Sequence, residues 1–153
     1  MSAGAGARPR LATRHADAED SPGLLLWQVN NQWQAAQRAA LKPFDLTHMQ
    51  FVLLASLSWL NTDGPVTQKE LGEHVASHPM MTSQVLRGLE KRGLVERAPH
   101  PDDGRARALA PTKTGRALAN KAVVAVEACD DEFFAVLGAK QQAFTAALQK
   151  LKR

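Results

Sequence analysis

Residues able to hydrogen-bond to bases and phosphates gather near the middle of the chain, just after Pro79. Small hydroxyls, a side-chain amide and a guanidinium can each pair with base edges or phosphate oxygens of a nucleic acid. Their spacing would put them on one face of a helix, with apolar residues on the other face. Without further context, the same residues would form an ordinary solvated helix surface. The outward positions are Met80, Met81, Ser83, Gln84 and Arg87.

Two arginines further along the chain offer the same chemistry. Arg105 and Arg107 follow Asp103-Gly104, a dipeptide that favours a tight hairpin turn. Because the side chains of a strand alternate with a period of two, we expect both arginines on one face of the return strand. There they would contact DNA phosphates or a minor groove, unless they serve only solubility. Asp103 and Gly104 are expected to hold the turn, with Asp103 pairing with an arginine.

Capping signals place these residues on a pair of helices. The run from Thr67 to Glu70 has the form of a capping box, which opens a short helix. His78 and Pro79 suit the cap and the first position of a second helix, and Gly93 suits the residue beyond its end. The link between the helices is short, as in a helix-turn-helix. The inward stripe of the second helix comprises Thr82, Val85, Leu86 and Leu89.

A β-hairpin follows this pair of helices. A strand from Leu94 to Ala98 leads into the turn, and the return strand ends at Pro111. Helix, turn, helix and hairpin in this order are the plan of a winged helix-turn-helix, whose second helix enters the major groove while the hairpin contacts flanking DNA. The sequence therefore predicts a mainly α-helical fold with a small β-hairpin wing.

Two apolar helices are predicted before the helix that starts at Thr67. Ser21 and Pro22 suit the start of a first helix that ends at Lys42 and carries two apolar faces. A capping box at Thr47 opens a helix to about Asn61 with almost no polar face, which places that helix at the centre of the fold. Its apolar residues are Met49, Phe51, Val52, Leu53, Leu54, Leu57, Trp59 and Leu60.

Further apolar helices follow the hairpin. A long helix is predicted from Lys113 to Leu137, with Gly138 as its end and a short final helix after it. This is more apolar helix than one small domain needs, so a further surface, which could be that of a second subunit, is expected to cover it. Two-fold symmetry would present two recognition helices to a pseudo-palindromic DNA site. The apolar positions are Leu118, Ala122, Ala125, Cys129, Phe133 and Val136 on the long helix, and Phe144, Leu148 and Leu151 on the last.

An ordered set of short motifs resembles the MarR-type transcription regulators. No single motif is specific, but their order and spacing match that family over about residues 24–151. They correspond to the family's helix before the recognition helix, the exit of the recognition helix, the wing motif and the residues that close the wing. The matching runs are 46–51 (LTHMQF), 66–71 (VTQKEL), 89–97 (LEKRGLVER), 103–105 (DGR) and 112–115 (TKTG).

The resemblance implies a homodimer that binds double-stranded DNA. Residues 21–153 would form one domain, in which 21–42 and 113–153 are dimerisation helices and 46–112 are the winged helix-turn-helix lobe. DNA contacts are expected from Thr67, Gln68, Lys69, Met80, Met81, Ser83, Gln84, Arg87, Arg105 and Arg107.

The resemblance also implies a cleft between the dimer helices and the DNA-binding lobe that takes a small anionic aromatic ligand. Trp27 or Trp33 would stack on this ligand, and His48 would pair with its anion. The alternative, in which these rings belong to the core of a dimer interface, stays open. The candidate ligand-binding residues are Trp27, Trp33, His48 and Phe51.

Composition argues against several other classes of protein. The chain has 153 residues, the length of one domain, and a net charge of +4, which fits a nucleic-acid partner. A single cysteine, Cys129, rules out an intrachain disulfide, and its place on an apolar stripe predicts an inert thiol in a reducing cytoplasm. No apolar run is long enough for a membrane span, and residues 1–20 are expected to form a disordered N-terminal arm.

No catalytic or metal-binding pattern is recognisable, so neither an enzyme nor a cofactor is expected. The sequence predicts a cytoplasmic, sequence-specific DNA-binding regulator, most simply a ligand-responsive repressor that acts as a homodimer. An activator or a nucleoid-type regulator is the alternative within this class. Outside it, the alternative is a winged-helix module that binds proteins and not DNA. Such a module should expose apolar side chains at the positions of Arg105, Arg107, Arg87 and Gln84.

Overall fold

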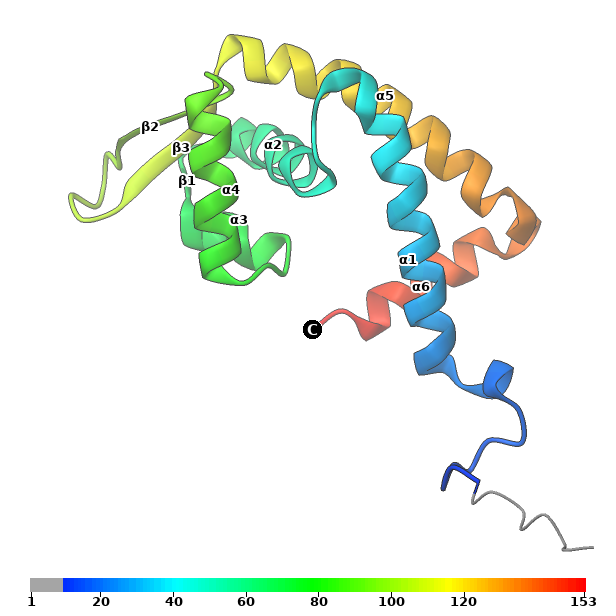
Figure 1. The fold of residues 1–153 in the computed structure, drawn as a ribbon. Coiled ribbons are helices and arrows are strands. Elements are labelled where there is room, and N and C mark those ends of the chain that lie inside the picture. The colour runs from blue at the N-terminus through cyan, green and yellow to red at the C-terminus, as the bar shows by residue number, and fades with distance from the viewer. Residues whose placement is uncertain (1–9) are drawn as a thin grey trace, which may run out of the picture. The chain divides into compact units, whose positions relative to one another are not determined.

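The computed structural model describes residues 10–153 and contains two compact units (Figure 1). The first unit is Met1–Gln32 and the second is Trp33–Arg153. Helix α1 (Pro22–Leu41) begins in the first unit and ends in the second. No helix among the described residues is long and apolar enough to cross a membrane.

The described part of the first unit leads into α1. Ala18–Asp20 form a short 3-10 turn. The Leu24 N–H donates a 3.2 Å hydrogen bond to Ser21 Oγ, which confirms the predicted cap at Ser21. Residues 1–9, part of the predicted arm, lie outside the described residues.

Helices α2 (His48–Leu60), α3 (Gln68–His74) and α4 (Pro79–Lys91) form the helical part of the lobe in the second unit. Both predicted capping boxes are present. Gln50 N–H donates to Thr47 Oγ1 at 3.1 Å while Thr47 N–H donates to Gln50 Oε1 at 3.0 Å. Thr67 and Glu70 repeat the arrangement at 3.1 and 3.0 Å. At each helix start, two backbone N–H groups that have no acceptor within the helix thereby gain a hydrogen bond.

The end of α4 follows the predicted pattern of a glycine stop. Gly93 has φ 69°, a left-handed conformation that glycine adopts without strain. Its N–H donates to the Glu90 carbonyl at 2.9 Å, and the Leu94 N–H donates to the Leu89 carbonyl at 3.0 Å. These two bonds form a Schellman motif, which turns the chain out of α4 and into the wing.

The sheet has three antiparallel strands, in the order β1 (Val66–Thr67), β3 (Arg107–Pro111), β2 (Val95–Pro99). Strands β2 and β3 are the predicted hairpin, which projects away from the helices (Figure 1). The sequence did not predict β1, because two residues carry no period. Val66 pairs with Leu109 and so attaches the hairpin to the start of α3.

The base of the wing is closed by residues of the family-like run 112–115. Thr112 Oγ1 donates to the Gly93 carbonyl at 2.6 Å and accepts from the Gly115 N–H at 3.0 Å. A Cβ on Gly115 would overlap the Leu94 carbonyl, so only glycine allows this close approach. Thr112 is also the N-cap of α5 (Lys113–Phe134).

The core of the second unit surrounds α2, as predicted, but Trp59 is an exception. Leu53, Leu54 and Leu57 are fully buried. Trp59 is 77% exposed, so one residue of this almost wholly apolar helix does not lie in the core. Residues two apart on a helix face in different directions, and Leu57 already occupies the inward position of that turn.

The C-terminal helices also depart from the predicted stripe. Ala119, Ala122 and Val126 of α5 are buried, whereas Val136 is 90% exposed. The face of α5 that packs on the core is therefore rotated relative to the predicted stripe, and the two share Ala122. After Phe134 the chain passes through a 3-10 segment, Ala135–Lys140, whose kink at Gly138 confirms the predicted break before α6 (Gln141–Leu151).

Candidate nucleic-acid interface

Helix α4 presents an outward face at its N-terminal half. His78 caps the helix, with the Met80 N–H donating to its Nδ1 at 3.2 Å, and Pro79 occupies the first position, as predicted. Met80 is 68% and Met81 50% exposed, although both side chains are apolar. Of the other outward positions, Gln84 and Arg87 are exposed and Ser83 is half-buried.

The opposite face anchors α4 on α3. The predicted inward residues Thr82, Leu86 and Leu89 are buried, and Val85 is half-buried. Thr82 Oγ1 donates to the His78 carbonyl at 3.1 Å. A Cβ on Gly72 of α3 would lie only 3.3 Å from Thr82 Oγ1, so the two helices approach closely there. This packing holds the outward residues of α4 in a fixed orientation.

The start of α3 carries the next three predicted contact residues. Thr67 and Gln68 are half-buried and Lys69 is exposed. The Thr67 hydroxyl accepts the Glu70 N–H within the capping box, which leaves its own hydrogen to donate. Lys69 contributes a cation beside the turn between the two helices.

The wing differs from the prediction in its turn. Strand β3 begins at Arg107, so Arg105 lies in the turn and the two arginines do not share one face of a strand. The turn spans the residues between His100 and Ala106, because the His100 N–H donates a hydrogen bond to the Ala106 carbonyl at 3.1 Å. Arg105 therefore lies inside the turn. Both arginines are exposed, Arg105 at the tip and Arg107 at the start of β3, opposite Pro99.

Asp103 holds the turn through the backbone and not through an arginine side chain. Its Oδ1 accepts the Arg105 N–H at 3.0 Å, a typical aspartate turn. The predicted pairing of Asp103 with an arginine side chain was therefore wrong, because its carboxylate accepts a hydrogen bond from the backbone N–H of Arg105. Gly104 does not adopt a positive φ, and a Cβ there would meet open space.

Sequence reasoning missed one arginine of this region. Arg97 on β2 donates through Nε to the Glu90 carboxylate near the end of α4, and both side chains are about three-quarters buried, at 25% and 27% exposure. The pair links the wing to the helix before it. Both residues stand in the run 89–97, which was noted for its family likeness without a role for either.

Of the four candidate ligand residues, Trp33 and His48 lie in contact. The rings of Trp33 and His48 meet edge to face, with centroids 5.0 Å apart and an interplanar angle of 71°. Phe51 is buried in the core. Trp27 is 67% exposed and belongs to the first unit.

The Trp33–His48 pair has polar neighbours on α5. Asp130 Oδ1 accepts hydrogen bonds from Trp33 Nε1 at 2.8 Å and from Gln37 Nε2 at 2.7 Å. Gln37 is fully buried, and its Oε1 has no hydrogen-bond partner. A buried unpaired acceptor costs free energy unless a donor reaches it.

The environment of His48 favours the neutral imidazole. Burial lowers the pKa of His48, and the Arg38 guanidinium lowers it further, while Asp130 opposes both effects. A neutral imidazole can still donate one hydrogen bond to an anion.

Cys129 is half-buried in the same unit. Burial and the carboxylates of Asp130 and Glu132 raise the pKa of the Cys129 thiol, which keeps it protonated and poorly reactive. Among the described residues, no three histidine, cysteine or acidic side chains are grouped so that they could hold a metal ion.

Comparisons with known proteins agree with this arrangement. A model of the MarR family matches residues 46–106, which include α2, α3, α4 and β2. The chain is 43% identical over 132 residues to the uncharacterized HTH-type transcriptional regulator YdcH of Bacillus subtilis, covering 86% of this chain and 89% of that one. It is 38% identical over 136 residues to the HTH-type transcriptional repressor Rv2887 of Mycobacterium tuberculosis, covering 88% and 96% of the two chains.

A solved structure extends the likeness to the fold. The crystal structure of Rv2887 in complex with salicylic acid matches with a TM-score of 0.68 at 36% identity. The match covers 89% of this chain and 98% of that one.

Proposed function

The chain belongs to the MarR family of transcriptional regulators, and we propose that it is a ligand-responsive repressor that binds a pseudo-palindromic operator as a homodimer. The observation that carries this proposal is the exposed polar and cationic face of α4, held in the same unit as a hairpin that bears two exposed arginines. A helix and a hairpin placed in this order contact the major groove and the DNA beside it.

In this proposal the N-terminal half of α4 enters the major groove. Met80 and Met81 provide apolar contact for thymine methyl groups, and Gln84 has the donor and acceptor that read adenine. Arg87 and Ser83 bind phosphate or guanine edges. From α3, the contacts to the DNA backbone come from Thr67, Gln68 and Lys69.

The wing supplies the second contact. Arg105 at the tip and Arg107 at the start of β3 are separate cations on a projecting hairpin, and they reach the phosphates or the minor groove beside the helix contact. Arg97 is paired with Glu90 and serves to position the wing.

Exposed apolar side chains support a homodimer. Large apolar residues left in solvent are typical of surfaces that a partner covers. They occur near the start of α1 and near the end of α6. At these places they belong neither to the proposed DNA-binding surface nor to the core. The residues are Leu24, Leu25, Leu26, Trp27, Val29, Leu148 and Leu151.

A relative supports both the repressor role and the ligand in this proposal. Rv2887 is named a repressor, and its solved complex holds salicylic acid. In this chain, the edge-to-face pair of Trp33 and His48 offers an aromatic surface beside a hydrogen-bond donor. The unpaired Oε1 of Gln37 in the same polar cluster is an acceptor, so it suits a hydroxyl group of the ligand and not its anion. We assign a small anionic aromatic ligand to this cluster.

A gel shift on the DNA that flanks the gene itself tests the proposal. Binding should survive an excess of random DNA and weaken as salt is raised, because released counterions drive phosphate binding. Equal affinity for random DNA at every salt concentration would contradict a sequence-specific regulator.

The ligand assignment has its own test. Salicylate should change tryptophan fluorescence and release operator DNA over the same concentration range, since only differential affinity shifts an equilibrium. His48→Ala should weaken both effects and leave DNA binding without ligand nearly intact. A saturable fluorescence change that leaves DNA binding unaffected would contradict the regulatory role.

A module that binds proteins is the competing function. Its wing should expose apolar side chains, whereas Arg105 and Arg107 are the exposed residues here. The exposed apolar side chains of Met80 and Met81 favour this alternative.

A further inference from the structure

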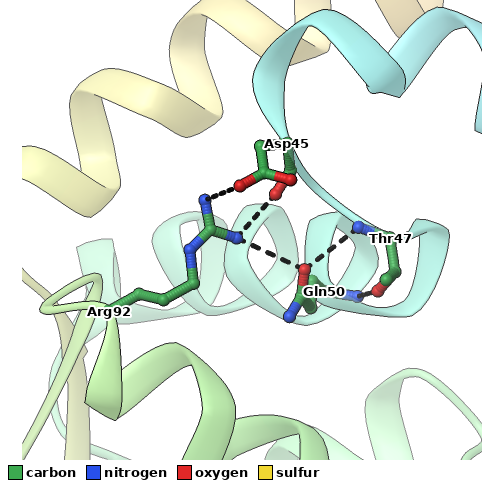
Figure 2. A network of polar contacts seen from close by, with 4 residues as sticks. All are labelled: Asp45, Thr47, Gln50 and Arg92. Carbon is green, nitrogen blue, oxygen red and sulfur yellow. Dashed lines mark hydrogen bonds and ion pairs between the residues drawn. The ribbon is translucent and has the colours of Figure 1, made fainter.

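A cationic hollow lies where α1 ends, α2 begins and α4 ends. Its volume is about 510 Å³. The polar residues that line it are Arg38, Lys42, Asp45, Thr47, Gln50 and Arg92. Figure 2 shows Arg92 reaching from the end of α4 to Asp45 and Gln50 at the start of α2.

The hollow carries more positive than negative charge. Arg38, Lys42 and Arg92 face a single carboxylate, that of Asp45. In the described part of the chain, neither Arg38 nor Lys42 forms an ion pair with an acidic side chain. All three cations are exposed to solvent, so their mutual repulsion is screened, and an anion placed between them would be attracted by each of them.

The one carboxylate present is held weakly. Arg92 Nη2 lies 3.8 Å from Asp45 Oδ2, and the Asp45 side chain is fully exposed. Exposed pairs at such a distance contribute little to stability. The firm contact of Arg92 is with the Asp45 backbone, whose carbonyl accepts from Nη1 at 2.7 Å. An incoming anion can therefore displace the carboxylate without breaking the bond that positions Arg92.

The start of α2 adds to the attraction. The helix begins at His48, and its capping box leaves the Thr47 hydroxyl hydrogen free to donate. The positive end of the helix dipole favours negative charge at this position. Two guanidinium groups, an ammonium group and a hydroxyl thus converge on one hollow.

We propose that this hollow binds the phosphate group of a small molecule. Two cations without an acidic partner match the two negative charges of a phosphate dianion. A ligand with a single carboxylate would compensate only one of the two positive charges. Arginine forks also fit the oxygen geometry of phosphate. The bound phosphate takes the place of the Asp45 carboxylate at Arg92 and joins the ends of α1 and α4 to the start of α2.

The phosphate in question is not one of operator DNA. Arg92 follows the last residue of α4, whereas Met80 and Met81 lie in its first turn. A helix of 13 residues is about 20 Å long, so the hollow lies at the far end of α4 from the face assigned to the groove.

Thermal unfolding in inorganic phosphate tests this site. At mildly alkaline pH, phosphate should raise the melting temperature in a saturable manner, while sodium chloride at equal ionic strength should not. Arg38→Gln and Lys42→Gln should each weaken the apparent phosphate affinity by roughly tenfold, as expected when a charge-assisted hydrogen bond is removed. Lys121→Gln, which removes an exposed cation from α5 outside the hollow, should leave the affinity unchanged.

Asp45→Asn gives the opposite prediction. It removes the competing carboxylate and should tighten phosphate binding, and asparagine tolerates the φ of 51° at this position. A stabilisation that does not saturate, or one that persists in Arg38→Gln and Lys42→Gln, would overturn the proposal.

A DNA-binding measurement separates the two sources of phosphate. In buffer without phosphate, Lys42→Gln should bind DNA with the wild-type dependence on salt. A flatter dependence would assign the hollow to the DNA backbone and would also overturn the proposal.

Discussion

Arg97 on β2 donates a hydrogen bond through Nε to the carboxylate of Glu90 on α4, and this pair joins the wing to that helix. Both side chains are largely shielded from water, so the loss of one partner leaves the other charge poorly solvated. Arg97→Met should lower the free energy of unfolding by about 1–3 kcal/mol. Denaturant titration would measure this loss.

The pair also permits a double-mutant cycle. Glu90→Gln combined with Arg97→Met should cost less than the sum of the single changes, because the two residues interact directly. Additive losses would show that the pair does not couple the wing to α4.

The exposed face of α4 should determine sequence specificity. Gln84→Ala removes a side chain that can form two hydrogen bonds with adenine, and should cost about 1–3 kcal/mol on the operator but little on random DNA. Competition binding with both DNAs measures the difference. The same loss on every sequence would mean that Gln84 contacts only the backbone.

His48 should make stability depend on pH. Burial and Arg38 hold the pKa of His48 below 6.5, its value in the unfolded chain. Below that pH the unfolded chain binds the proton more readily, so the free energy of unfolding should fall as the pH is lowered from 6.5 towards the pKa of the folded state.

Denaturant titrations of the wild type and His48→Asn across this range provide the measurement. The variant should lose this part of the pH dependence, and Arg38→Gln should lose some of it. An identical pH profile in His48→Asn would rule out His48 as the source.

Helix α6 should contribute to the dimer. Leu148 and Leu151 are exposed in the single chain, and burial of each such side chain in an interface contributes roughly 1.5–3 kcal/mol. Leu148→Asp with Leu151→Asp should shift sedimentation from dimer to monomer. Met80→Gln, on α4, serves as the control that leaves assembly unchanged. A wild-type chain that sediments as a monomer at micromolar concentration would contradict the homodimer.

Local signals in the sequence predicted local structure well. The capping boxes at Thr47 and Thr67, the cap at His78 and the stop at Gly93 all form as predicted. Each depends on hydrogen bonds within a few residues, so the residues themselves specify the geometry. The break at Gly138 belongs to the same group.

Features set by distant contacts were harder to predict. The strand at Val66 exists because it pairs with Leu109, and two residues give no alternating pattern. The exposed Trp59 and the rotated buried face of α5 depend on which neighbours each helix packs against. A hydrophobic pattern shows that a face is apolar but not which partner covers it.

The candidate site shows the same division. The sequence placed the outward residues of α4 correctly but put Arg105 on a strand, because the closing bond from His100 to Ala106 joins residues across the turn. Among the residues that it grouped with Trp33, His48 meets the Trp33 ring edge to face. The roles of Arg97 and Arg92 required the fold, since their partners lie on other elements.

If the wing and α4 bind DNA together, the arginines of the wing must contribute to the salt dependence of operator affinity. Affinities of the wild type, the double variant Arg105→Ala with Arg107→Ala, and the control Lys121→Ala should be measured over a series of salt concentrations. We expect the double variant to bind more weakly, with the slope of log affinity against log salt reduced by about 0.9 for each phosphate that is no longer neutralised, and the control to match the wild type. An unchanged affinity and slope in the double variant would contradict the assignment of the wing to DNA.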